Sequence, residues 1–207
     1  MSRTLHIASE AETLQADLYG DMVTPRVVVL VHGSGWDASG GREIAPRFLA
    51  RGVAALALNL RGYDGSTGTS RWEESGAWSP VVDLAATKAM LRKAGAREIA
   101  LVGASMGGHA VLASSFDEDV ECVVSISAPA QETPDELSAR VRGRKLFVCA
   151  NEDTLGAAPH VLRAFAAADA PKTLLMFGGK EHSRGMFAAP YGEEAISAIV
   201  DFVARGE

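Results

Sequence analysis

The sequence predicts an α/β protein whose mostly parallel central sheet carries helices on both faces. Apolar runs typical of strands alternate with segments of helical periodicity, which indicates parallel strands joined by crossover helices. The runs at 26–32 and 54–60 are apolar almost throughout, as in strands covered on both faces. The 207 residues can bury one sizeable core, and no linker, repeat or low-complexity segment divides them. We therefore expect a single domain over 1–207.

Eight apolar runs predict the strands of this sheet, and the first two are expected to pair as a hairpin. In order, the predicted strands are 4–9, 14–20, 26–32, 54–60, 98–103, 121–127, 145–150 and 173–179. A polar loop over 61–78 is the longest irregular segment. Because only a short stretch separates the sixth strand from the next predicted helix, we expect no cap domain and an open site.

Helical periodicity and start signals predict the intervening helices. The first places Ile44, Phe48 and Leu49 on one face, and the second begins with Ser79 as N-cap and Pro80 as its first residue. The remaining helices are predicted near 106–116, 133–136 (a TPDE capping box), 159–168 and 193–204.

The stretch LVGASMGGHAVLASS at 101–115 contains a buried strand, a turn carrying Ser105, and the start of a helix. Its Gly-x-Ser-x-Gly spacing has a steric reason. A turn this sharp would bring side chains at Gly103 and Gly107 into the neighbouring strand and helix. The serine hydroxyl is thereby presented at the carboxyl edge of the sheet, where ligands bind in such folds.

A serine hydroxyl needs a base, and the base needs an acid to orient it. Two later strand ends supply candidates: Asn151-Glu152-Asp153 and Lys180-Glu181-His182. Both lie at the same edge of the predicted sheet, in the chain order serine, acid, histidine.

With these residues in place, the sequence resembles a compact α/β-hydrolase. The resemblance extends from RVVVLVHGSG through GASMGG and ANED to GGKEHS. It implies that Ser105 is the nucleophile, Asp153 the acid, with Glu152 as its competitor, and His182 the base. It also implies an oxyanion hole formed by the backbone N–H groups of Ser34 and Met106.

The other four histidines have simpler interpretations. His6 lies on a strand away from the edge, His160 opens a helix, and His109 packs or faces solvent one turn after the serine. His32 is expected to be structural.

One rival pattern is a dinucleotide fingerprint, because Gly33 to Ala38 follows a strand and fits G-x-G-x-x-G/A. Asn59 and Arg61 would then face a ribose or its 2′-phosphate. The next helix signal starts several residues too late, however, and Trp36 and Asp37 are poor neighbours for phosphate.

Composition excludes several other classes. A net charge of −6 without a basic cluster argues against nucleic acid, and no apolar run is long enough to span a membrane. Cys122 and Cys149 lie inside strand-like runs and are expected to be reduced core thiols, so we expect a cytoplasmic protein. HExxH, CxxC and phosphate-loop motifs are absent, so neither a metal nor a cofactor is expected.

The expected substrate is a small-molecule ester. The chain resembles dienelactone-hydrolase-like and small carboxylesterase-like proteins, but Ser105 stands where the former carry cysteine. We therefore expect hydrolysis of carboxylic esters with a small or medium acyl group, and Trp36, Trp72, Trp78, Met106, Met186 and Phe187 are candidate wall residues. The alternatives are a thioesterase with the same triad and a binding protein that keeps the fold without turnover.

Overall fold

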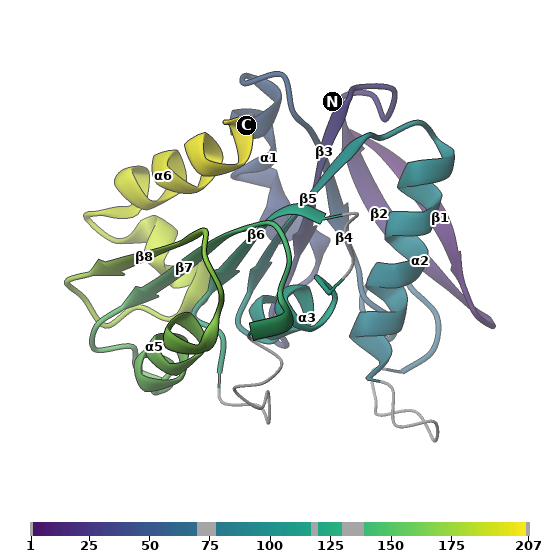
Figure 1. Cartoon of the computed structure of the whole chain (residues 1–207). Helices are drawn as coiled ribbons and strands as arrows, with labels where there is room; N and C mark the ends of the chain where they lie inside the picture. The colour runs from purple at the N-terminus through teal and green to yellow at the C-terminus, as the bar shows by residue number, and fades with distance from the viewer. Residues whose placement is uncertain (1, 70–77, 117–119, 130–138, 206–207) are drawn as a thin grey trace.

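The computed structural model describes residues 2–69, 78–116, 120–129 and 139–205. Within them, eight strands form one sheet in the order β1-β2-β4-β3-β5-β6-β7-β8 (Figure 1). The strands are β1 (Ser2–Ser9), β2 (Glu12–Tyr19), β3 (Arg26–Val31), β4 (Ala54–Leu58), β5 (Glu98–Ala104), β6 (Val120–Ile126), β7 (Arg144–Ala150) and β8 (Lys172–Phe177). β1 pairs antiparallel with β2, β2 pairs antiparallel with β4, and all other neighbours are parallel. The predicted hairpin and mostly parallel sheet are confirmed.

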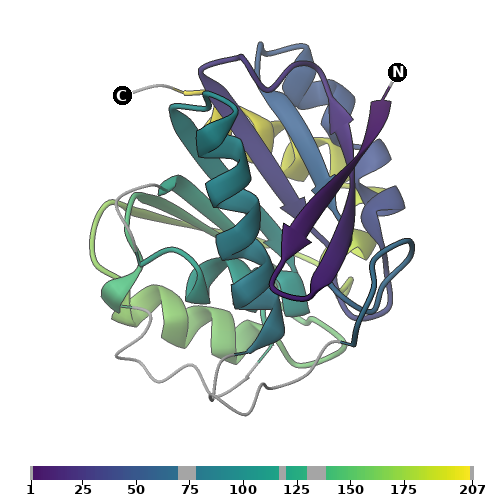
Figure 2. The ribbon, with the colours of Figure 1, turned by 90° about the vertical axis from the view of Figure 1, so that its right-hand side faces the viewer.

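Helices cover both faces of the sheet. One face packs against α2 (Ser79–Lys93), α3 (Met106–Ala113) and α5 (Ala158–Ala167). The other packs against α1 (Ala45–Leu49), α6 (Gly192–Ala204) and two 3-10 helices, η1 (Ala38–Arg42) and η2 (Ser183–Ala188). In Figure 2, α2 in teal lies to one side of the first strands and α1 in blue to the other.

The apolar runs produce the buried core that the sequence predicts. All five residues of β4 are wholly buried, and so are Val27, Val28 and Val29 of β3. Cys122 and Cys149 are free, and both are fully buried. Among the described residues, no helix is both long and apolar enough to cross a lipid bilayer.

The first predicted helix differs from the structure. The chain instead forms η1, capped by the Asp37 side chain accepting from the Ser39 N–H at 2.7 Å, and then the short α1. Gly41 lies so close to the sheet that a Cβ there would be 2.7 Å from Ala57. Within α1, Phe48 is buried but Leu49 is 43% exposed, so Leu49 does not share the buried face that was predicted for it.

Two further predictions concern helix ends. The N-cap of α2 is Trp78, so Ser79 is its first residue and Pro80 its second, one position from the prediction. The TPDE capping box at 133–136 lies outside the described residues. Only residues 127–143 separate β6 from β7, too few for a cap domain with its own core.

Candidate active site

The turn between β5 and α3 places Ser105 at the carboxyl edge of the sheet. Its backbone has φ 54° and ψ −120°, a conformation that residues other than glycine rarely adopt. A Cβ on Gly103 would lie 2.1 Å from the Gly107 carbonyl oxygen, and one on Gly107 would lie 2.4 Å from the Val31 carbonyl oxygen. Both glycines are therefore required by the close packing of β5, α3 and β3.

Three side chains from separate loops form a chain of hydrogen bonds at this edge. Nε2 of His182 lies 2.9 Å from Oγ of Ser105. Nδ1 of the same ring lies 2.9 Å from each carboxylate oxygen of Asp153. The structure thus brings together all three residues that the sequence singled out. This arrangement lets the imidazole accept the serine proton while its other nitrogen stays bound to a carboxylate.

The Asp153 carboxylate is buried and fixed by several donors. Oδ1 accepts the backbone N–H groups of Leu155 at 2.9 Å and Ala157 at 3.4 Å, and the thiol of Cys149 lies 3.8 Å from Oδ2. The side chain of Asp153 is wholly inaccessible, whereas Glu152 is exposed. The structure therefore places Asp153, and not its competitor, against the imidazole.

The two expected oxyanion donors belong to segments next to the Ser105 turn. Met106 is the first residue of α3, where an N–H has no acceptor within the helix. Ser34 follows Gly33, whose backbone packs so closely on the turn that a Cβ there would lie 3.1 Å from the Cβ of Ser105. This contact shows that the segment before Ser34 lies close to the Ser105 turn, and the oxyanion role of Ser34 stays a prediction.

His32 holds that segment in place. Its Nδ1 donates to the Gly33 carbonyl at 2.8 Å, so its Nε2 is free to accept the Leu60 N–H at 3.2 Å. Burial lowers the pKa of His32 below its ordinary value, which favours the neutral ring that this pattern needs. The role is structural, as expected.

The remaining histidines occupy separate places. His6 is exposed on β1, and Nδ1 of His160 lies 2.6 Å from the Arg163 guanidinium. His109 is buried with its ring centroid 5.1 Å from that of Trp78, and desolvation lowers its pKa to about 4.

The dinucleotide pattern has a structural explanation. Asn59 turns inward, accepts the Ala38 N–H at 2.6 Å and donates to the Asp64 carbonyl at 2.6 Å. Arg61 is 4% exposed in its side chain and forms an ion pair with Asp83 at 2.8 Å. The segment after the glycine loop is a short 3-10 helix, which offers no α-helical N-terminus to a pyrophosphate.

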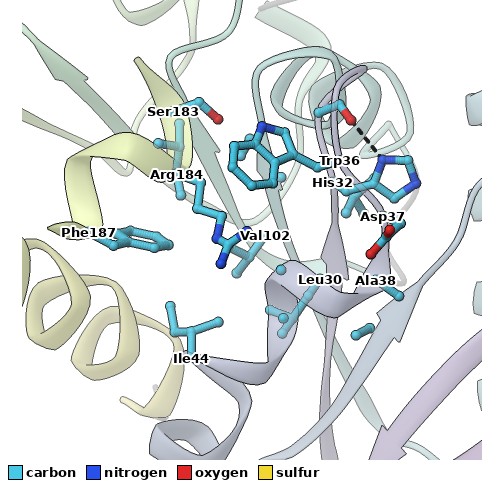
Figure 3. A pocket seen from close by; sticks show the side chains of 18 residues that line it. Leu30, His32, Trp36, Asp37, Ala38, Ile44, Val102, Ser183, Arg184 and Phe187 are labelled. Atoms are coloured by element: carbon cyan, nitrogen blue, oxygen red, sulfur yellow. Dashed lines mark hydrogen bonds between the residues drawn. The ribbon is translucent and has the colours of Figure 1, made fainter. Parts of the chain in front are cut away.

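The candidate wall residues do not lie together. Trp36 and Phe187 line a hollow beside the turn (Figure 3). Met186 is wholly buried and does not reach the edge, and Trp78 and Met106 are 8% exposed. Trp72 lies outside the described residues.

Sequence reasoning missed two residues near this site. Ser127, at the end of β6, accepts the Ser183 N–H at 3.0 Å and so fixes the residue after His182. Arg184 crosses the hollow of Figure 3. Neither residue sits in a motif, and their proximity arises only from folding. Within the described parts of the chain, no group of three or more His, Cys, Asp or Glu side chains could hold a metal ion.

The fold is that of an α/β-hydrolase. The chain belongs to the alpha/beta hydrolase family, whose sequence model matches residues 28–205. No curated protein matches the sequence at a significant level.

Solved structures share the fold at low sequence identity. An esterase from Pyrococcus furiosus superposes with a TM-score of 0.81 at 18% identity, covering 98% of this chain and 92% of that one. A dienelactone hydrolase from Anabaena variabilis gives 0.75 at 18%, with 99% and 95% covered. A monoacylglycerol lipase from Paleococcus ferrophilus gives 0.78 at 18%, with 92% and 98% covered.

Proposed function

We propose that this protein is a serine hydrolase that cleaves carboxylic esters of a small or medium acyl group through an acyl-enzyme. The observation that carries the proposal is the unbroken hydrogen-bond chain from Asp153 through His182 to Ser105, with 2.9 Å at each step. Membership of the hydrolase family and the esterase and lipase structures of the same fold support it.

In the first step, Oγ of Ser105 attacks the ester carbonyl while Nε2 of His182 takes the hydroxyl proton. The carbon–oxygen bond to the alcohol then breaks, and the imidazolium returns the proton to the departing alcohol. Asp153 keeps the ring oriented and stabilises its positive charge. The N–H groups of Ser34 and Met106 are the proposed donors to the carbonyl oxygen as it becomes negative.

In the second step, water attacks the acyl-enzyme, with His182 again taking a proton, and the acid is released as Ser105 is restored. A thioester would react by the same route, so the natural leaving group is an alcohol or a thiol. The substrate is a small molecule, and the reaction as proposed uses no metal or cofactor. Because both cysteines are free and buried, we propose the cytoplasm as the compartment.

Substitution of each triad residue tests the proposal. Ser105→Ala and His182→Ala should each abolish turnover of p-nitrophenyl acetate. Asp153→Asn should retain about two orders of magnitude more activity than His182→Ala, because the base survives but loses its orientation. His160→Ala is the matched control, since that imidazole pairs with Arg163 on α5 and should keep wild-type turnover. Wild-type turnover by folded Ser105→Ala would overturn the assignment of the nucleophile. Loss of turnover in His160→Ala but not in His182→Ala would overturn the assignment of the base.

A further inference from the structure

An apolar hollow lies on the α1–α6 face of the sheet, next to the carboxyl ends of β3 and β5 (Figure 3). It contains about 550 Å³ of space between protein atoms, part of it open to solvent. Its apolar wall is formed by the side chains of Leu30, Ile44, Ala57, Val102, Ile126 and Phe187. Such a surface favours an uncharged hydrocarbon group over a polar one.

The hollow adjoins the proposed catalytic groups. Three of its lining residues are their immediate chain neighbours: Gly33 precedes the proposed oxyanion donor, Ala104 precedes the nucleophile, and Ser183 follows the base. The hollow therefore begins one residue along the chain from each proposed catalytic segment, and this closeness is the ground for assigning it to the substrate.

Two side chains partly cover the hollow. The guanidinium of Arg184 lies 4.4 Å from the ring centroid of Trp36 and pairs with Glu43 at 3.1 Å. Trp36 is 46% exposed, and the Glu43 side chain is 52% exposed. Because solvent screens such an exposed pair, these contacts hold the cover weakly, and a ligand can displace it. The carboxylate of Glu43 also balances the charge of Arg184, so the cover does not select for an anion.

We infer that this hollow binds the acyl group of the substrate, a neutral aliphatic chain of small to medium length, and that Trp36 and Arg184 limit that length. The inference rests on the proposed function. The acyl group is assigned to the hollow because it remains bound to the nucleophile through both steps. The alcohol must depart and water must enter, so the leaving group requires the open side.

The test compares two substrate series on the purified full-length chain. The first series keeps the p-nitrophenyl leaving group and extends the acyl chain from acetate through butanoate and octanoate to dodecanoate. The second keeps the acetyl group and extends the alcohol. In the wild type, kcat/KM should rise about fourfold for each methylene that the hollow buries and then fall once the chain exceeds it.

Two variants change the hollow in opposite directions. Val102→Phe fills it from the sheet and should lower the octanoate-to-acetate ratio of kcat/KM by at least about tenfold. Trp36→Ala removes half of the cover and should raise the same ratio and move the optimum to longer chains. Leu162→Ala is the matched control, because Leu162 is an equally exposed apolar residue at 45% on the opposite face of the sheet. Its ratio should stay at the wild-type value.

The outcomes separate this inference from the function on which it rests. If the wild type and the three variants hydrolyse esters with the same dependence on acyl-chain length, the hollow is not the acyl site, but the proposed hydrolase function stands. A shift confined to the alcohol series would overturn the acyl assignment. Absence of all ester turnover, together with no reaction of Ser105 with a fluorophosphonate, would overturn the hydrolase itself. If Val102→Phe does not fold, the Trp36→Ala comparison decides, because that side chain lies at the surface.

Discussion

At the scale of single residues, the proposed nucleophile Ser105 is also a strained residue. The turn holds its backbone in a region that costs of order 1–3 kcal/mol, and the compensation comes from packing that two glycines permit. The Gly-x-Ser-x-Gly pattern predicts this turn, because its spacing has one steric explanation. The orientation of the imidazole was not predictable in the same way, since it depends on contacts made by residues far apart in the chain.

A buried histidine on α3 should make stability depend on pH. Burial lowers the pKa of His109 to about 4 from 6.5, so between these values the unfolded chain binds a proton that the folded chain does not. The free energy of unfolding is therefore highest above the unfolded-state pKa of 6.5, and it falls as the pH drops from there towards about 4. We expect a loss of about 2 kcal/mol from His109 between about pH 7.5 and about pH 5.

Urea unfolding of wild type and His109→Gln at those two pH values measures this loss. The variant should lose about 2 kcal/mol less than the wild type on acidification, whatever its stability at the higher pH. His32 is buried in both proteins, so its own contribution cancels in the comparison. An equal loss in wild type and variant would mean that His109 does not carry the effect.

At the scale of elements, the placement of His182, the proposed base, depends on a contact between the end of β6 and η2. Ser127 has φ 46° and is wholly buried, and its Oγ accepts the N–H of Ser183 next to His182. The same hydroxyl lies 3.7 Å from the sulfur of Met186 and 3.9 Å from that of Cys149. This cluster joins the loop that carries His182 to the strand ends near Ser105 and Asp153.

Removal of this contact should reduce catalysis more than binding. In Ser127→Ala the Ser183 N–H loses its acceptor, so the imidazole is less firmly placed, and kcat should fall about ten- to a hundredfold with KM little changed. Ser125→Ala is the control, because that buried hydroxyl two residues earlier bonds to the Gly108 carbonyl of α3 instead. A comparable loss of kcat in both variants would show that the effect is general destabilisation and not positioning.

The elements also show where prediction from sequence failed. All eight strands were predicted to within a few residues, because apolar runs between turn signals have few alternative explanations. A helix forms where the sequence places Ile44 and Phe48, but the 3-10 helix before it and the exposure of Leu49 were not predicted. The broken segment depends on the close approach of Gly41 to β4, which no local pattern encodes. The same limit applies to the hollow beneath Trp36, since its walls come from both halves of the chain.

At the scale of the whole molecule, a buried ion pair joins elements from the first half of the chain. Arg61, after β4, pairs with Asp83 on α2, and the same carboxylate accepts the hydroxyl of Ser9 at the end of β1. The hairpin, β4 and α2 are thereby joined around one charged pair inside the protein. Solved hydrolase structures with 18% identity superpose over most of the chain, so this fold tolerates wide changes in sequence.

The central claim is that Ser105 is a nucleophile activated by His182, and labelling with a fluorophosphonate followed by peptide mapping tests it most directly. Ser105 is partly exposed and its hydroxyl is hydrogen-bonded to the imidazole, so a fluorophosphonate can test it without knowledge of the natural substrate. The structure predicts a single adduct on Ser105 in the wild type, none in Ser105→Ala, and much slower labelling in His182→Ala. An unlabelled but folded wild-type protein, or an adduct on another serine, would contradict the claim and favour a binding role for this fold.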